Sequence, residues 1–158
     1  VETFVDSDWA GCRKSRKSTS RGIPYLGGVA VRAWSSNQNV IALSSGEAEY
    51  YAALKGASSA LGFQSMLRDL GIHASITLYT DRSAARGIIH RAGLGKLRHL
   101  ATGYLWLQSA VKAKKLQVRD LLTRDLLTKH LSSSGMWKNL EKLHMSPEDG
   151  RTKAVPLI

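Results

Sequence analysis

Short runs of β-branched and aromatic residues alternate with polar residues over the first part of the chain. The run at 1–5 (VETFV) predicts a strand. The segment 23–39 (IPYLGGVAVRAWSSNQN) predicts two antiparallel strands joined near Gly27 and Gly28, because glycine pairs favour tight hairpin turns. Residues 40–43 are expected to form a third short strand. The chain is therefore predicted to begin with antiparallel strands.

Helical spacing replaces this alternation from residue 46 to about residue 70. Apolar residues recur there at i, i+3, i+4 and i+7, which predicts one long helix with a single apolar face; they are Tyr50, Ala53, Leu54, Ala57 and Leu61. Further elements follow along the chain: a strand at 75–80, helices at 82–91 and 100–115, a strand at 116–119 and a helix at 120–131. This order predicts an α/β domain in which the long helix crosses over between parallel strands.

The length of 158 residues suits one domain with a hydrophobic core and is short for two. We expect a domain at 1–131 and a tail at 132–158, because the sequence turns polar from Ser132. The tail is expected to hold at most one short helix and then to be disordered. The chain has neither an initiator methionine nor a signal-peptide pattern, which predicts a piece of a longer protein, such as a domain of a polyprotein.

Two classes of protein are disfavoured by the composition. No stretch approaches the roughly 18 consecutive apolar residues of a membrane-spanning helix, so we expect no membrane partner. The single cysteine excludes an internal disulfide and fits a reducing compartment.

Basic residues outnumber acidic ones by 23 to 12, which gives a formal net charge of +11. Such a surplus favours a polyanionic partner, most often nucleic acid, over a merely solubilising surface or a polybasic membrane patch. A basic loop suited to phosphate contacts combines cations with hydroxyl groups, namely Arg13, Lys14, Arg16, Lys17, Ser18 and Thr19. A second basic cluster on a glycine-rich link consists of Lys96, Arg98 and His99. Trp9 and Trp34 are expected to pack in the core or against the sheet.

Acidic residues stand where the predicted strands end. Asp6 ends the first strand, and Asp81 ends the strand after the long helix. If these strands are parallel neighbours, both carboxylates lie at the same edge of the sheet. The start of the long helix offers a third carboxylate and the last helix a fourth, namely Glu47 or Glu49, and Asp120 or Asp125. Converging carboxylates predict a site for Mg²⁺ or Mn²⁺, and two such ions are a known arrangement for phosphodiester cleavage.

The residues alone leave the choice between the two glutamates open. Ser44 and Glu47 have the spacing of a capping box, which gives Glu47 a structural role at the start of the helix. Helical phase does not decide, because at about 100° per residue Glu47 and Glu49 flank opposite sides of the apolar face.

Several strings in the chain resemble a known family. VETFVDSDWAG and ITLYTDRSAARGII resemble the two aspartate-bearing strands of type I ribonuclease H domains, and EYYAALKGASSAL resembles their glutamate-bearing helix. The order of motifs from DSDWAG through SSGEAEY and YLWLQ to DLLTKHL resembles the ribonuclease H region of copia-type retrotransposon polyproteins, over about 1–131. The resemblance implies a ribonuclease H-like α/β fold: a mixed sheet with three antiparallel N-terminal strands, then parallel strands, and helices on both faces.

The same resemblance implies a function. It is endonucleolytic hydrolysis of the RNA strand of RNA–DNA hybrids during reverse transcription, with two Mg²⁺ ions, which Mn²⁺ can replace, and no small-molecule cofactor. The implied catalytic and metal-binding residues are Asp6, Glu49, Asp81 and Asp125. The implied partners are the hybrid and the reverse transcriptase portion of the same polyprotein, inside the cell in cytoplasmic virus-like particles or in the nucleus.

One departure from the family pattern concerns the last acid. The duplicated string RDLLTRDLLT replaces the usual linker before it, so Asp120 competes with Asp125 for the fourth position. The alternative function is a catalytically weak or inactive nucleic-acid-binding module of the same fold.

Overall fold

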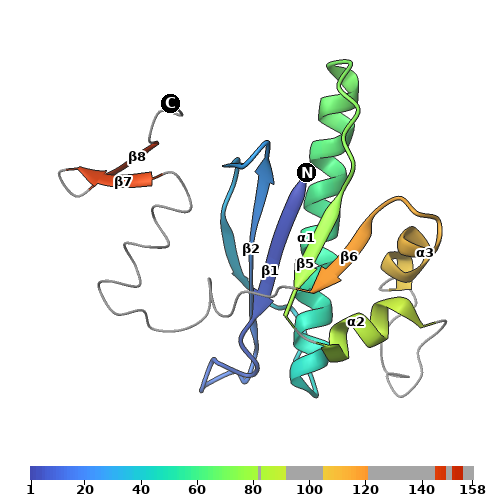
Figure 1. Cartoon of the computed structure of the whole chain (residues 1–158). Coiled ribbons are helices and arrows are strands. Elements are labelled where there is room, and N and C mark those ends of the chain that lie inside the picture. Colours follow the sequence, from blue (N-terminus) through green and yellow to red (C-terminus); the bar gives the residue numbers. More distant parts are fainter. Residues whose placement is uncertain (82, 92–104, 121–144, 149–150, 155–158) are drawn as a thin grey trace.

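A mixed sheet and a long helix beside it form the centre of the molecule (Figure 1). The computed structural model describes residues 1–81, 83–91, 105–120, 145–148 and 151–154. The sheet has six strands, which are β1 (Glu2–Ser7), β2 (Thr19–Leu26), β3 (Val29–Ala30), β4 (Trp34–Asn37), β5 (Thr77–Thr80) and β6 (Gln117–Asp120). The helices in these ranges are α1 (Ser45–Asp69), α2 (Ser83–His90) and α3 (Trp106–Lys112).

The sheet changes from antiparallel to parallel pairing at β1. On one side β1 pairs antiparallel with β2, with Asp6 opposite Arg21. On the other side it pairs parallel with β5, which in turn pairs parallel with β6, so that Thr80 lies opposite Asp120. The long helix α1 therefore connects the antiparallel part to the parallel part, as the pattern of elements predicts, and this mixed sheet with its helices confirms the predicted fold class.

The local predictions agree with much of this sheet, but three strands, β2, β3 and β4, occupy the region where two were expected at 23–39, and β2 already begins at Thr19. Gly27 and Gly28 form the turn between β2 and β3, and their φ angles of 58° and 84° lie where glycine is favoured. The third strand expected at 40–43 is wrong, because β4 is Trp34–Asn37, and residues 40–43 form the connection to α1. Backbone groups of that connection form hydrogen bonds with side chains rather than with another strand. Trp9 Nε1 donates to the carbonyl of Ala42, and the amide of Leu43 donates to Glu47.

Small residues allow α1 to pack closely against the sheet. A Cβ atom added to Gly56 would lie 2.2 Å from Cγ1 of Val5, and it would also crowd Leu78 on β5. Val5 and Leu78 are fully buried in the core beside α1. Because the helix axis is so close to the strands, its first turns lie next to the ends of β1 and β5.

Aromatic side chains occupy the opposite side of the central strands. Phe4 alternates with the buried Val5 along β1, and its ring stacks on Tyr79 of β5 at 4.7 Å. Tyr25 of β2 meets Phe4 edge to face at 5.4 Å. The helix expected at 120–131 lies outside the described residues except for Asp120, which belongs to β6.

A separate two-stranded antiparallel sheet, β7 (Met145–Glu148) with β8 (Arg151–Ala154), lies within the segment expected to be a tail. The sequence pattern did not predict these strands. The division of the chain at residue 131 stays a prediction. None of the helices in the described ranges is long and apolar enough to cross a membrane.

Candidate metal centre

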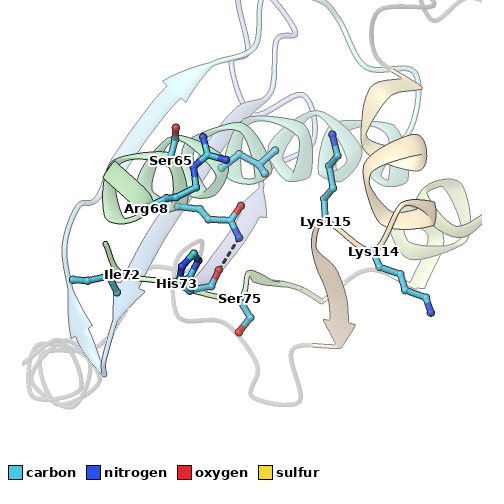
Figure 2. A pocket seen from close by; sticks show the side chains of 10 residues that line it. Ser65, Arg68, Ile72, His73, Ser75, Lys114 and Lys115 are labelled. Atoms are coloured by element: carbon cyan, nitrogen blue, oxygen red, sulfur yellow. Dashed lines mark hydrogen bonds between the residues drawn. The ribbon is translucent and has the colours of Figure 1, made fainter. Parts of the chain in front are cut away.

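A groove with basic side chains lies at the C-terminal end of α1. Figure 2 shows Arg68, His73, Lys114 and Lys115 around this groove, whose volume is about 730 Å³. The amide of Gln64 donates to the carbonyl of Ala74 at 2.6 Å and holds the loop after the helix in place. Among the described residues no acid lines the groove, so its chemistry does not suit a hard cation such as Mg²⁺.

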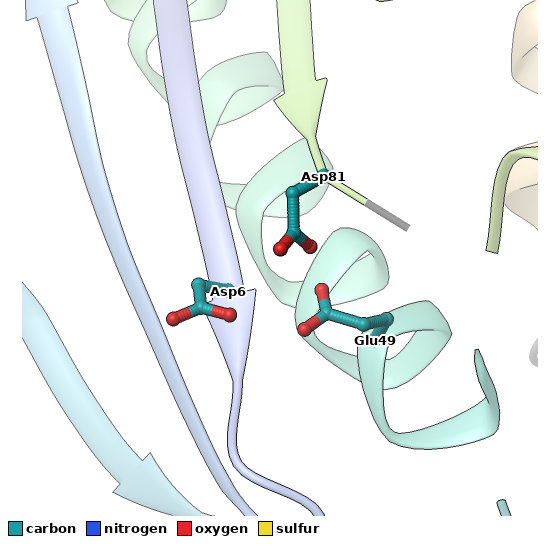
Figure 3. Close-up of side chains that lie close together, drawn as sticks. All are labelled: Asp6, Glu49 and Asp81. Carbon is teal, nitrogen blue, oxygen red and sulfur yellow. The ribbon is translucent and has the colours of Figure 1, made fainter. Parts of the chain in front are cut away.

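Three acids converge at the other end of α1. Asp6 comes from β1, Asp81 follows β5 and Glu49 comes from the first turns of α1. Each offers a carboxylate oxygen, and these oxygens all lie within 4.8 Å of one another. Figure 3 shows the three carboxylates facing a common space between the two strands and the helix. We call this group the acid cluster.

The parallel pairing of β1 with β5 explains why the two aspartates meet. Phe4 lies opposite Tyr79, so the residues two positions further along each strand, Asp6 and Asp81, reach the same edge of the sheet. The close packing of α1 at Gly56 then brings Glu49 to the same place. The prediction that the strand-end acids would lie side by side is confirmed.

Hydrogen bonds from both strands orient the carboxylate of Glu49, which is only 1% exposed. Its Oε1 accepts from the amide of Ser7 at 2.7 Å and from the hydroxyl of Ser7 at 3.2 Å. The hydroxyl of Thr80 lies 3.5 Å from Oε2. Sequence reasoning missed Ser7 and Thr80, although each directly neighbours a predicted acid, because their role depends on where the helix lies.

The electrostatics of the cluster favour protonation when no cation is present. Burial raises the pKa of Glu49 to about 8, and the nearby charges of Asp6 and Asp81 act in the same direction. Burial likewise raises the pKa of Asp6, together with the charge of Asp81, although the hydrogen bond with Glu49 and the charge of Arg21 oppose this. The protein therefore holds together carboxylates that resist being ionised side by side.

Glu47 has a different and purely structural environment. The hydroxyl of Ser44 caps α1 by accepting from the amide of Glu47 at 3.1 Å. Oε2 of Glu47 accepts from the amide of Leu43 at 2.9 Å, and the hydroxyl of Tyr51 donates to its Oε1 at 3.3 Å. The two glutamates thus divide between the start of the helix and the acid cluster.

Neither candidate for the fourth acid joins the cluster in the described part of the chain. Asp125 lies outside the described residues. Asp120 ends β6 and forms an ion pair of 2.9 Å with Arg86 of α2. Among the described residues the group of three acids does not include Asp120.

The basic loop between β1 and β2 exposes its cations to solvent, but one of its hydroxyl groups is buried. Arg13, Lys14 and Arg16 are exposed and Lys17 is half-buried. Ser18 is fully buried, and its Oγ accepts from the amide of Ala10 at 3.0 Å, so it supports the loop from inside and cannot reach a phosphate. Thr19 is half-buried, and its hydroxyl donates to Oδ1 of Asn37 at 3.2 Å. The second predicted basic cluster, Lys96, Arg98 and His99, lies outside the described residues.

The two tryptophans expected to pack inside behave differently. Trp34 is half-buried beside the core, and the ammonium of Lys55 lies 4.7 Å from its ring centre. Trp9 is 55% exposed, which contradicts the expected packing.

No family model matches the chain. The chain is 29% identical over 125 residues to the retrovirus-related Pol polyprotein from transposon TNT 1-94 of Nicotiana tabacum, and the match covers 78% of this chain. It is also 29% identical over 126 residues to the corresponding polyprotein from transposon RE2 of Arabidopsis thaliana. The chain spans about 9% of the length of each of these relatives.

The fold has a solved counterpart in the RNase H1 of the halophilic archaeon Halobacterium salinarum NRC-1. The two structures superpose with a TM-score of 0.52 at 13% sequence identity, over 77% of this chain and 84% of the archaeal one. By sequence the chain resembles part of the Pol polyproteins of plant retrotransposons, and the fold that brings its three acids together is the ribonuclease H fold.

Proposed function

We propose that the chain is a ribonuclease H, a metal-dependent endonuclease that hydrolyses the RNA strand of RNA–DNA hybrids. The observation that carries this proposal is the acid cluster at one edge of the mixed sheet. A formal net charge of +11 makes a polyanionic substrate the natural partner of that edge. The ribonuclease H fold and the similarity to Pol polyproteins support the same reaction.

The residues of the cluster fit divalent cations. Oδ2 of Asp6 is buried, and no donor among the described residues reaches it, so it is available as a ligand atom. Carboxylate oxygens are the ligands that Mg²⁺ and Mn²⁺ prefer. We propose that Asp6, Glu49 and Asp81 hold two such ions, with Asp125 as the fourth ligand. Bound in pairs, divalent ions activate a water molecule and stabilise the leaving oxygen of a phosphodiester.

The chain itself contributes the orientation of the ligands. The amide and hydroxyl of Ser7 hold one oxygen of Glu49, which leaves Oε2 directed toward Thr80 and the cluster. Ser7 is part of the same strand as Asp6, so one backbone segment positions two of the three acids. Such hydrogen bonds to a ligating carboxylate fix its geometry before the cation binds.

The basic loop is proposed to hold the phosphate backbone of the substrate. Arg13, Lys14 and Arg16 are exposed on the connection that follows β1, and therefore follow the strand that carries Asp6. Contacts of this kind position a nucleic acid without reading its sequence. Lys96, Arg98 and His99 are proposed as a second set of phosphate contacts.

The similarity to Pol polyproteins also supports a context for the reaction. We propose that the chain acts during retrotransposon reverse transcription, next to the reverse transcriptase portion of the same polyprotein, in the cytoplasm or nucleus.

A cleavage assay with an end-labelled RNA–DNA hybrid tests the proposal. We expect cleavage of the RNA strand with Mg²⁺ or Mn²⁺, none with EDTA, and none of duplex DNA of the same sequence. The matched variant is Asp81→Asn, which removes one charge of the cluster at nearly constant volume. If the wild type binds the hybrid but cuts it no faster than this variant, the chain is instead a nucleic-acid-binding module without nuclease activity.

Salt dependence of binding tests the role of the basic loop. Each lost phosphate contact should reduce the slope of log K against log salt by about 0.7–0.9. We expect this reduction for Arg13→Ala and Lys14→Ala. Lys115→Ala, which removes another exposed cation, from the groove at the far end of α1, should leave the slope unchanged.

A further inference from the structure

Trp9 presents its ring to solvent while its polar atom is held by the protein. The side chain is 55% exposed, and its Nε1 donates to the carbonyl of Ala42 at 3.0 Å. A large aromatic side chain usually lies mostly buried, and exposure of this size in a fixed orientation is unusual. The residue stands three positions after Asp6, at the start of the connection between β1 and β2.

The backbone around Trp9 is built to keep it there. Ala10 adopts a φ of 53°, a left-handed conformation that costs free energy for a residue other than glycine. The amide of Ala10 donates to the fully buried Ser18, and the carboxylate of Asp8 accepts from the amide of Thr19. These hydrogen bonds flank Trp9 on both sides and join the two arms of the loop. The exposed ring therefore sits on a rigid and locally strained segment, and such strain often accompanies functional sites.

The segment that accepts the indole hydrogen bond is also apolar and exposed. Ile41 is 52% exposed and Leu43 is 67% exposed. The amide of Leu43 is held by Glu47, two residues before Glu49. Trp9 follows β1, which carries Asp6, and residues 41–43 precede α1, which carries Glu49. Figure 1 shows the β1–β2 connection and the start of α1 at the same end of the molecule.

We propose that Trp9 contacts the nucleic acid substrate, its ring packing against the sugar and base surface of a nucleotide beside the scissile phosphodiester. This inference rests on the proposed function and adds a residue that sets where the substrate lies. Exposed cations accompany the ring on the same loop, at Arg13, Lys14 and Arg16. Proteins that hold single nucleic acid strands without reading their sequence combine aromatic faces with cations in this way. Because Nε1 is already bonded to Ala42, the ring offers an apolar face and no base-specific donor, so the contact positions the strand without reading its sequence.

Indole fluorescence measures this contact without requiring cleavage. The experiment uses the full chain with an RNA–DNA hybrid in Ca²⁺, and repeats it with Asp81→Asn in Mg²⁺. The difference between wild type and Trp9→Phe isolates the signal of Trp9 from the other three tryptophans. We expect the hybrid to quench that difference signal and to protect it from iodide.

Affinity and cleavage position provide the second measurement. Trp9→Ala should weaken hybrid binding about tenfold or more, as loss of an aromatic contact to a nucleotide does, while Trp9→Phe should retain most of the affinity. Leu70→Ala is the matched control, because Leu70 is 70% exposed at the far end of α1, and it should leave binding unchanged. In the active protein Trp9→Ala should also shift the positions at which the RNA strand is cut.

The outcomes separate this inference from the proposed function. If the hybrid binds without quenching Trp9, and Trp9→Ala binds it as tightly as the wild type does, the proposed contact is overturned. The nuclease proposal is not affected by that result. If the hybrid quenches Trp9 and binds more weakly to Trp9→Ala but is never cut, the contact holds and the nuclease proposal fails. If Trp9→Ala and Leu70→Ala weaken binding equally, the effect is not specific to Trp9 and the inference is overturned.

Discussion

The amide of Ser7 donates a 2.7 Å hydrogen bond to Oε1 of Glu49. This bond joins the residue after Asp6 on β1 to the first turns of α1, across 42 positions of the sequence. Strand and helix therefore hold their acids in one arrangement through the protein's own contacts. The acid cluster is preorganised in this respect, and an ion that binds there needs little rearrangement of Glu49.

Replacement of Glu49 should separate catalysis from folding. Glu49→Gln keeps an oxygen that can accept from Ser7 but removes the charge that a divalent ion needs. We expect the rate of hybrid cleavage to fall more than about 100-fold, the upper range for residues that only orient a metal ligand. The metal-free variant should be at least as stable as the wild type, because an amide is neutral without taking up the proton that the buried Glu49 carboxyl needs. Cleavage assays and thermal unfolding in EDTA measure the two effects.

Glu47→Gln is the matched control for this variant. Glu47 is equally buried and lies two residues away, but it accepts from Leu43 and Tyr51 at the start of the helix. We expect a loss of stability of about 0.5–2 kcal/mol, typical of weakened helix capping, and little change in cleavage per folded molecule. Full activity in Glu49→Gln, or loss of activity in both variants, would contradict the division of roles.

The stability of the metal-free protein should depend on pH with a definite sign. Burial raises the pKa of Glu49 to about 8 from an ordinary value of 4.5. Between these values the folded protein keeps a proton that the unfolded chain releases, so the free energy of unfolding falls as pH rises from about 4.5 to about 8. The raised pKa of Asp6 acts in the same direction. Thermal unfolding in EDTA at a series of pH values measures this slope.

Mg²⁺ should counteract this loss of stability at the higher pH values. Because Mg²⁺ binds the ionised cluster of the folded state, it should raise the melting temperature most at pH 8 and above and little at pH 5. Glu49→Gln should flatten the slope measured in EDTA. A wild-type melting temperature that increases from pH 6 to pH 8 in EDTA would show that the pKa of Glu49 is not raised in the folded protein.

The two candidates for the fourth acid should respond differently to loss of charge. Asp120 is 40% exposed and paired with Arg86, so Asp120→Asn should lower stability by less than about 1 kcal/mol and leave cleavage nearly intact. Asp125→Asn should instead reduce cleavage strongly without a matching loss of stability. Cleavage rates of the two variants at saturating Mg²⁺ decide between them, and the opposite order would assign the role to Asp120.

Two glycines of α1 should respond to alanine with opposite signs. At Gly56 the added Cβ would lie 2.2 Å from Val5, so Gly56→Ala should destabilise the protein by about 1–3 kcal/mol through overpacking. At Gly62 no atom of the described residues lies within 4 Å of the added Cβ, so Gly62→Ala should stabilise it by about 0.5–1 kcal/mol through reduced backbone entropy. Urea unfolding of both variants measures the difference, and equal effects would show that the helix can move away from the sheet.

Gly56→Ala should also reduce cleavage, because displacement of α1 from β1 carries Glu49 away from Asp6. Gly62→Ala should leave the cleavage rate unchanged. This pair therefore links the close packing of the helix to the geometry of the acid cluster.

The sequence by itself determined the elements whose signals are local. Alternation predicted β1 and β5, and helical spacing predicted α1 almost to its ends. The pair Gly27 and Gly28 predicted a turn, and this turn requires their positive φ angles of 58° and 84°. The placement of Asp6 and Asp81 at strand ends was likewise readable, because it needs only the position of each strand along the chain. Side-chain period and turn chemistry act over a few residues, so a sequence displays them directly.

Tertiary structure alone decided the roles that depend on distant segments. The residues alone left the choice between Glu47 and Glu49 open, although the family resemblance implied Glu49. The position of α1 over β1, which depends on the close approach of Gly56 to Val5, is what places Glu49 beside Ser7 and Asp6. Ser18 was expected to contact phosphate but is fully buried. Trp9 was expected to pack inside but is exposed. Their surroundings are made by backbone groups at Ala10 and Ala42, and hydrogen bonds between segments become visible only when the chain has folded.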